Sequence, residues 1–275
     1  MSSSAITTAQ AAEQLDVLTA IVARASAQIN GISPATVVKR AKADHSPVTA
    51  ADEASEEIML EDLARALPGV PVISEESANS GHAHRHASFV IVDPLDGTRE
   101  YLAGSDEFTV NLAIVSAGVP IVGIVAAPGR GQVWRGIVGI KAERLRLTPS
   151  GGDGAEPIRV RPWPEASQAV ATVSRSHIDP ATEAFVTALG PVARVPCGSA
   201  IKFCRVAEGA ADVYPRLATT CEWDVAAGHA LVVAAGGIVV TPEGADMAYG
   251  RAEAAFRVPA FVAWGDSRKA AKLGR

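Results

Sequence analysis

The sequence predicts a mixed α/β protein, with an antiparallel sheet in the first half and a mixed sheet in the second half. Two observations lead to this fold class. In the first half, the apolar runs 109–115 and 119–126 flank Ser116-Ala117-Gly118, a pattern typical of a β-hairpin. In the second half, short apolar strand patterns alternate with helical patterns, which is the order found in α/β units.

Length and composition limit the class of protein. The chain has 275 residues, 48% of them apolar, and a formal net charge of -5. This acidic balance argues against binding to a nucleic-acid polymer, which favours basic proteins. A small anion can still bind where local charge opposes the net sign. The three cysteines lack the spacing of a zinc site or a disulfide framework, so we expect free thiols in a reducing cytoplasm.

Two helices are expected at the start of the chain. Residues 1–28 lack the basic start of a signal peptide and place Leu15, Leu18 and Val22 on one helical face. A second helix is expected from about Ala50 to Leu67, where a Pro-Gly pair stops it. No apolar run approaches the roughly 20 residues of a membrane helix, so no membrane span is expected. Further strands of this half are expected at residues 70–73, 89–92 and 132–136.

The second half begins near a segment rich in Gly, Pro and Ser. This segment, Leu147 to Pro157, predicts a boundary or an exposed loop, and we divide the chain into domains 1–150 and 151–275. Asp179-Pro180 then predicts a capped helix that runs to Leu189. Other helices are expected at 199–208 and 224–235, and strands at 169–173, 192–195, 212–214 and 238–241.

The stretch FVIVDPLDGTREY, residues 89–101, places Asp93 and Asp96 directly after a strand that we expect to be buried. Gly97-Thr98 follows, and it can open a helix whose free N–H groups accept an anion. Two carboxylates this close repel each other unless a cation lies between them or one is protonated. Oxygen ligands favour hard divalent cations such as Mg²⁺. Taken alone, the stretch fits either a metal site or a plain Asp-Pro turn with a helix cap.

Other acids occupy similar positions along the chain. Glu75 and Glu76 follow the strand at 70–73, and Asp224 and Asp52 lie near predicted helix starts. Each has a simpler alternative: a solvated acidic loop for the glutamates and a cap or dipole partner for the aspartates. No single one of these acids identifies a metal site.

The four motifs together resemble those of the inositol monophosphatase superfamily of Mg²⁺-dependent phosphatases. In chain order they are SPVTAAD, ISEES, DPLDGT and WDVAAG, between residues 46 and 228. Four further motifs resemble the 3'(2'),5'-bisphosphate nucleotidase (CysQ-type) branch: EFTVNLA at 107–113, SRSH at 174–177, GSAIKFC at 198–204 and VAEGAADVYPR at 206–216. The resemblance implies a layered α-β-α-β-α sandwich of the sugar-phosphatase type.

The resemblance also implies a site for two or three Mg²⁺ ions and a way to activate water. The implied metal ligands are Glu75, Asp93, the main-chain carbonyl of Leu95, Asp96 and Asp224. Asp52, paired with Thr98, would orient the attacking water or take its proton. The amides of Gly97 and Thr98 would bind the phosphoryl oxygens.

The implied reaction is hydrolysis of the 3'-phosphate of adenosine 3',5'-bisphosphate, or of its sulfated analogue, to AMP or adenosine 5'-phosphosulfate. The expected substrate contacts are Gly97, Thr98, Arg175, His177, Gly198, Ser199, Lys202 and Arg216. An inositol-phosphate or sugar-phosphate phosphatase with the same metal site is the alternative, and a non-catalytic sensor is the alternative from another class. We expect sensitivity to Li⁺, a cytoplasmic location, and a monomer or a homodimer. The segment His82 to His86 is expected to be a solvated loop.

Overall fold

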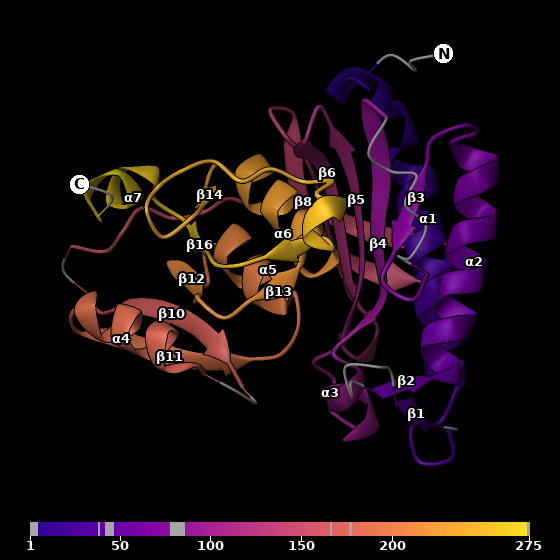
Figure 1. Cartoon of the computed structure of the whole chain (residues 1–275), viewed down its shortest axis with the longest axis horizontal. Helices are drawn as coiled ribbons and strands as arrows, with labels where there is room; N and C mark the ends of the chain where they lie inside the picture. Colours follow the sequence, from indigo (N-terminus) through magenta and orange to yellow (C-terminus); the bar gives the residue numbers. More distant parts are fainter. Residues whose placement is uncertain are drawn as a thin grey trace.

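Five layers of helices and sheets lie side by side in the computed structural model, which describes residues 5–37, 39–41, 47–77, 86–165, 167–175 and 178–273 (Figure 1). Two helices cover a seven-stranded sheet, two more separate it from a five-stranded sheet, and two lie on the outer side of that second sheet. In layer order the helices are α1 (Thr8–Gly31) and α2 (Ala50–Ala66), then α5 (Ile201–Ala207) and α6 (Glu222–Ala234), then α4 (Pro180–Ala188) and α7 (Ser267–Leu273). The expected α-β-α-β-α sandwich is confirmed.

The first sheet is antiparallel except at one edge, where β3 and β4 are parallel. Its strands, in spatial order, are β3 (Val72–Ser74), β4 (Ser88–Asp96), β5 (Thr109–Ser116), β6 (Val119–Ala127), β7 (Gln132–Ile137), β8 (Lys141–Thr148) and β9 (Gly151–Pro157). The predicted hairpin is β5–β6. Its turn places Ala117 and Gly118 at φ values of 51° and 78°, in the left-handed region.

Both faces of the sheet are buried at its strands β4 and β5, which explains why these two strands have no polar alternation. On β4, Val90 and Val92 pack into the core under α1 and α2. Phe89 and Ile91 point to the opposite face and pack into the core that includes residues of α5 and α6. The acid pair at the end of β4 is therefore mounted on a strand fixed from both sides.

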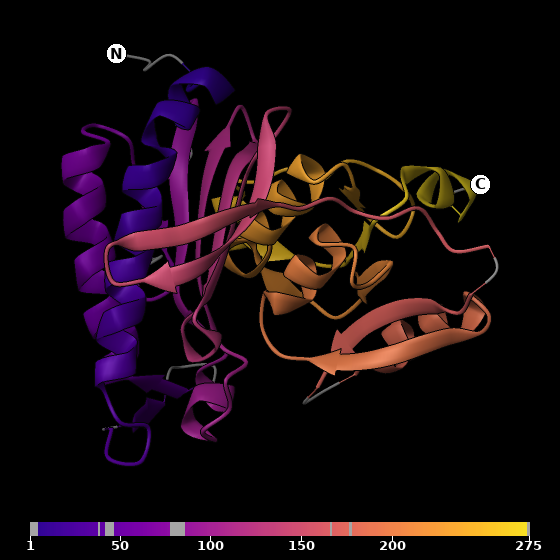
Figure 2. The same cartoon turned by 180° about the vertical axis from the view of Figure 1, so that it is seen from behind.

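The segment predicted as a boundary or exposed loop, 147–157, is instead the end of β8, a tight turn and β9. The two strands pair antiparallel from Thr148 with Gly151 to Glu143 with Pro157, and β9 reaches across α1 (Figure 2). Its glycines permit close approach, because a Cβ on Gly152 would lie 2.8 Å from Leu145 Cδ2. The division into 1–150 and 151–275 stays a prediction, but strand pairing places residues 151–157 in the first sheet.

The second sheet is mixed, as predicted. Strand β10 is parallel to β11 and β12, whereas β16 is antiparallel to β12 and β14. Its strands are β10 (Ala169–Ser174), β11 (Val192–Cys197), β12 (Val213–Arg216), β14 (Ile238–Val240) and β16 (Phe261–Trp264). The predicted cap of α4 is confirmed, since the Asp179 carboxylate accepts the Thr182 N–H at 2.9 Å.

Short elements that the sequence analysis did not predict complete the chain. They are β1 (Lys39–Ala41), β2 (Pro47–Thr49), β13 (Thr220–Cys221), β15 (Arg257–Val258) and the 3₁₀ turns η2 (Pro128–Arg130) and η3 (Ala252–Ala254). A five-residue helix, α3 (Thr98–Leu102), follows the acid pair. None of the helices in the described ranges combines the length and the apolar character that a membrane crossing requires.

Helix α6 packs unusually close to the first sheet and to α5. A Cβ added to Gly123 on β6 would lie 2.0 Å from the carbonyl oxygen of Ala227, and one added to Gly228 would lie 2.2 Å from Phe203 Cδ2. Only glycine fits at such contacts. This close packing fixes the N-terminal end of α6, and Asp224 with it, against the first sheet.

Candidate active site

The acid pair lies on a bulge at the end of β4. We predicted that the strand would end before Asp93, but its pairing with β5 continues, with Asp93 opposite Asn111 and Asp96 opposite Thr109. Between these two pairs, β4 advances by three residues and β5 by two. The extra residue on β4 makes a β-bulge, which changes the direction in which the neighbouring side chains point. The prediction of the strand end was wrong because apolar pattern alone does not show backbone pairing at polar residues.

Three aspartates from two distant parts of the chain meet at this bulge. Asp93, Asp96 and Asp224 each offer a carboxylate oxygen, and these oxygens lie within 4.8 Å of one another. Asp224 also caps its own helix, because its Oδ2 accepts the N–H of Cys221 at 2.9 Å and the hydroxyl of Thr220. The helix cap and the shared acidic cluster, offered as alternatives by the sequence, are both present.

Glu75 belongs to the same electrostatic cluster. Its N–H donates to the Val92 carbonyl at 3.3 Å, which holds it beside the end of β4. Burial raises the pKa of Asp93 well above its ordinary value, and the negative charges of Glu75, Asp96 and Asp224 raise it further. The acids therefore repel one another in the absence of a compensating cation.

Asp96 feels charges of both signs. Burial raises its pKa to about 7, and the nearby charge of Asp224 acts in the same direction. Lys202 and Arg216 lower this pKa, but they do not offset the first two causes. Asp96 thus lies close enough to both the carboxylates and the cations for charges of both signs to act on it.

The donor set fits a hard divalent cation. Asp93 is 1% exposed, and its Oδ2 accepts no hydrogen bond from any described residue. A buried carboxylate oxygen is costly when it is left unpaired, and the surrounding ligands are all oxygens. This cluster has the chemistry that a bound metal requires.

Asp52 and Thr98 are in direct contact, although 46 positions separate them in the chain. The Thr98 hydroxyl donates to Asp52 Oδ1 at 3.0 Å and lies 3.3 Å from the Leu95 carbonyl oxygen. Asp52 Oδ2 accepts the N–H and hydroxyl of Thr49, so Asp52 also closes a capping box on α2. Burial raises the pKa of Asp52 despite these hydrogen bonds.

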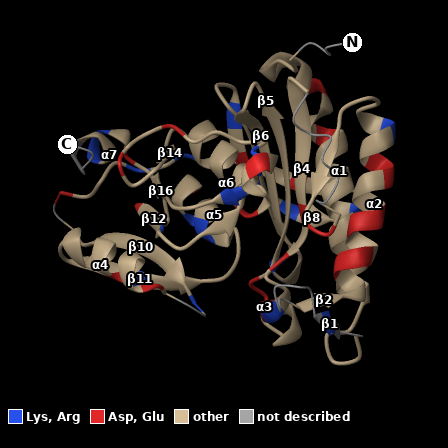
Figure 3. Cartoon of the chain, viewed as in Figure 1, with Lys and Arg blue, Asp and Glu red and all other residues tan. Residues whose placement is uncertain are grey.

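A cavity of about 600 Å³ opens beside the acids and is lined by charged residues of both signs. Glu75, Asp96 and Asp224 line it, and we call these three together with the buried Asp93 the acidic wall. Lys202 and Arg216 also line it, and we call this pair the cationic wall; Lys202 is carried by α5, the central helix with basic residues in Figure 3.

Most of the predicted substrate contacts reach this cavity. Those that line it are Gly97, Thr98, Gly198, Ser199, Lys202 and Arg216. Lys202 is only 3% exposed, and its Nζ donates to the Ser199 and Cys197 carbonyls at 2.7 and 3.3 Å. It also lies 5.2 Å from the centroid of the Tyr214 ring.

Two of the predicted substrate contacts, Arg175 and Gly198, instead donate hydrogen bonds to Glu107. Arg175 does not line the cavity; its Nε and Nη2 donate to Glu107 at 2.7 and 2.8 Å. The Gly198 N–H, expected to face an anion, donates to Glu107 Oε2 at 2.8 Å. His177 lies outside the described residues, as do positions 82–85 of the predicted histidine loop.

Glu107 is the residue that the sequence analysis missed. It stands at the head of the EFTVNLA motif, but a single glutamate before a strand carries no local signal of its partners. Those partners come from three other segments of the chain, at residues 130, 175 and 198. Only tertiary structure could identify it.

Comparisons with known proteins agree with this architecture. The Inositol monophosphatase family matches residues 4–267. The chain is 38% identical over 229 residues to the 3'(2'),5'-bisphosphate nucleotidase CysQ of Escherichia coli strain K12, covering 80% of this chain and 85% of that protein.

Solved structures give the same result. The CysQ structure from Bacteroides thetaiotaomicron superposes with a TM-score of 0.78 at 33% identity, covering 91% of this chain and 97% of that one. The inositol monophosphatase from Anabaena (Nostoc) sp. PCC 7120 gives a TM-score of 0.75 at 28% identity, with 96% and 95% covered. This chain belongs to the inositol monophosphatase family.

Proposed function

We propose that this protein is a 3'(2'),5'-bisphosphate nucleotidase that removes the 3'-phosphate of adenosine 3',5'-bisphosphate. One observation carries the proposal: a single cavity is lined both by the clustered carboxylates Glu75, Asp96 and Asp224 and by the cations Lys202 and Arg216. Such a cavity suits a substrate with one phosphate to be cleaved and a second to be held. Relatives named as CysQ nucleotidases support the same substrate class. The sulfated analogue, which keeps the 3'-phosphate, is proposed as a second substrate.

The acidic wall is the proposed metal site, for two or three Mg²⁺ ions. Its ligands would be Glu75, Asp93, the Leu95 carbonyl, Asp96 and Asp224. When bound, Mg²⁺ supplies positive charge to the phosphoryl oxygens and lowers the pKa of water. The unpaired Oδ2 of Asp93 and the raised pKa of Asp96 support this assignment, since both are relieved by a cation.

Asp52 and Thr98 are the proposed catalytic residues. The Thr98 hydroxyl already donates to Asp52 Oδ1, so its oxygen is left free to accept a hydrogen bond from water. Thr98 would orient the attacking water, and Asp52 would accept the proton that passes through this hydroxyl. The Gly97 and Thr98 amides, at the start of α3, would bind the phosphoryl oxygens.

The cationic wall would hold the phosphate that is not cleaved. Lys202 and Arg216 line the cavity, and the positive charges of both lower the pKa of Asp96 across it. Arg216 Nε is buried and has no hydrogen-bond partner within the described part of the chain. A buried guanidinium nitrogen in this state favours a bound anion. Ser199 completes the proposed contacts at the base of this wall.

The test is a substrate comparison with and without Mg²⁺. We expect phosphate release from adenosine 3',5'-bisphosphate to require Mg²⁺ and to exceed release from inositol 1-phosphate. The alternative is an inositol-phosphate or sugar-phosphate phosphatase with the same metal site. If inositol 1-phosphate were hydrolysed about tenfold faster, the nucleotide assignment would be wrong. Mg²⁺-independent release would contradict the metal site itself.

Three properties of the protein remain proposals of the same kind. We expect Li⁺ at millimolar concentration to inhibit the enzyme, as implied by the family resemblance. We expect a cytoplasmic enzyme that is a monomer or a homodimer. Size-exclusion chromatography with light scattering would decide the oligomeric state, and a Li⁺ titration of the phosphate-release assay would decide the inhibition.

A further inference from the structure

Glu107 joins four segments of the chain at one buried carboxylate. It lies between α3 and β5, is 5% exposed, and accepts two hydrogen bonds from Arg175 at 2.7 and 2.8 Å. Its oxygens also accept the Arg130 Nη2 and the Gly198 N–H, each at 2.8 Å. The hydrogen bonds of Arg175 are the main cause that lowers the pKa of Glu107, so the carboxylate is charged.

The Gly198 hydrogen bond fixes the turn 197–199 against the acidic wall. Ser199 has a φ of 48°, a left-handed conformation that is strained for a side chain with a Cβ. Its hydroxyl donates to the main-chain carbonyls of Glu107 and Asp96, both at 2.9 Å. A Cβ on Gly97 would lie 2.2 Å from the Ser199 hydroxyl oxygen, so the turn touches the phosphoryl-binding loop.

The same turn holds the ammonium of Lys202. Its Nζ donates to the carbonyls of Cys197 and Ser199, the residues on either side of Gly198. A chain of contacts therefore runs from Glu107 through Gly198 to Lys202. Glu107 itself does not line the cavity.

We propose that Glu107 is a positioning residue for recognition of the second phosphate. It fixes the turn 197–199, and the carbonyls of this turn hold the ammonium of Lys202 in the lining of the cavity. The inference rests on the proposed function, because it assumes that Lys202 binds the phosphate that is not cleaved. Loss of the Glu107 contacts should weaken binding of that phosphate while the metal acids and the Asp52–Thr98 pair keep their places.

The test compares Glu107→Gln with the wild type on adenosine 3',5'-bisphosphate and adenosine 3'-monophosphate, which lacks the second phosphate. Glutamine has the same shape, but its NH₂ group cannot accept a hydrogen bond from Arg175 or Gly198. We expect the KM for the bisphosphate to rise about tenfold, with kcat and the KM for the monophosphate within about twofold. The affinity for AMP, which retains the 5'-phosphate, should fall in parallel in a calorimetric titration.

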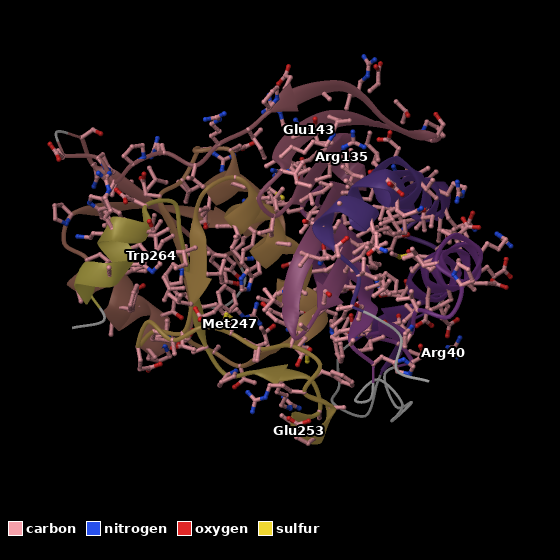
Figure 4. All side chains as sticks on the ribbon, turned by 90° about the horizontal axis from the view of Figure 1, so that it is seen from above. Arg40, Arg135, Glu143, Met247, Glu253 and Trp264 are labelled. Atoms are coloured by element: carbon pink, nitrogen blue, oxygen red, sulfur yellow. The ribbon has the colours of Figure 1, made fainter. Side chains whose placement is uncertain are left out.

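The matched control is Glu143→Gln. Glu143 on β8 accepts Arg135 Nε at 3.1 Å, and the two residues are labelled side by side in Figure 4; neither of them lines the cavity. This change also removes the charge of a largely buried, ion-paired glutamate in the first sheet. All kinetic constants of Glu143→Gln should stay within about twofold of the wild type.

The outcomes separate the inference from the proposed function. A wild type that releases no Mg²⁺-dependent phosphate from the bisphosphate refutes the proposed function. Equal KM values of the wild type for the two nucleotides refute binding of the second phosphate by the cationic wall, and the inference with it. A wild type that prefers the bisphosphate, with Glu107→Gln unchanged or altered equally for both substrates, refutes the inference alone. If Glu107→Gln does not fold, Arg175→Gln decides by the same criterion, because the Arg175 side chain is 51% exposed and supplies two of the hydrogen bonds.

Discussion

The two walls of the cavity are built in different ways. The acidic wall is centred on β4 and its bulge, among strands buried on both faces, and the segment after β3 and the start of α6 add Glu75 and Asp224 to it. The cationic wall joins Arg216, at the end of β12, to Lys202 on a short helix, which follows a strained turn held by hydrogen bonds to other segments. If the proposed roles hold, the residues for phosphate-ester cleavage and those for selectivity are held in place by different contacts. Substitutions on the acidic wall should affect every phosphate ester, whereas those on the cationic wall should affect only bisphosphates.

The largest effect is expected on the acidic wall, from Asp93→Asn. An amide cannot replace the carboxylate charge that would hold the cations, so turnover should fall by about 10³-fold or more on every substrate. Because Asp93 is repelled by its neighbours, the metal-free variant should be at least as stable as the wild type. Phosphate release at saturating Mg²⁺ and thermal unfolding in EDTA measure the two effects. Full activity would contradict the metal assignment.

A smaller and selective effect is expected on the cationic wall, from Lys202→Met. Methionine keeps the bulk of the buried chain but removes the charge. The KM for adenosine 3',5'-bisphosphate should rise about tenfold, and the KM for adenosine 3'-monophosphate should change little. Steady-state kinetics on both nucleotides measure this difference. An equal rise in KM for both substrates would contradict separate roles for the two walls.

The smallest expected effect is a pH dependence of the protein's stability, and it arises from Asp96 in the acidic wall. The pKa of Asp96 is raised to about 7 in the folded protein from an ordinary value of 3.8. Between these values the folded state binds a proton that the unfolded state releases, so stability should fall as pH rises from about 4 through 7. In EDTA, the Tm should therefore decrease by several degrees over this range. Added Mg²⁺ should raise the Tm more at higher pH than at lower pH.

Asp96→Asn is the control for this pH dependence, because an amide does not titrate. Its Tm in EDTA should change less between pH 5 and pH 8 than the Tm of the wild type. A wild-type Tm that rises over this interval in EDTA would show that the acids are already compensated without a cation. Thermal unfolding of both proteins in parallel buffers gives the comparison.

Most of the helices and the central strands of the first sheet could be predicted because their signals are local, but β16 and α7, after residue 241, were not predicted. Leu15 and Leu18 mark one face of α1, and the apolar run after residue 88 marks a strand buried on both faces. The β8–β9 hairpin was missed because the glycines and prolines of 147–157 are typical of a loop. The backbone pairing between β8 and β9 that makes this segment a strand cannot be seen from residue types. The bulge in β4 was missed for a similar reason, since backbone pairing at Asp93 and Asp96 has no apolar pattern.

The sequence by itself determined the residue types of the site and the family resemblance, because its motifs are short and continuous. It placed the acids at strand and helix ends, where side chains of separate elements can meet. Only the tertiary structure decided the roles of Glu107, Arg175 and Gly198. Their hydrogen bonds join segments far apart in the chain, and such contacts depend on how the two sheets pack around α5 and α6 rather than on any local pattern.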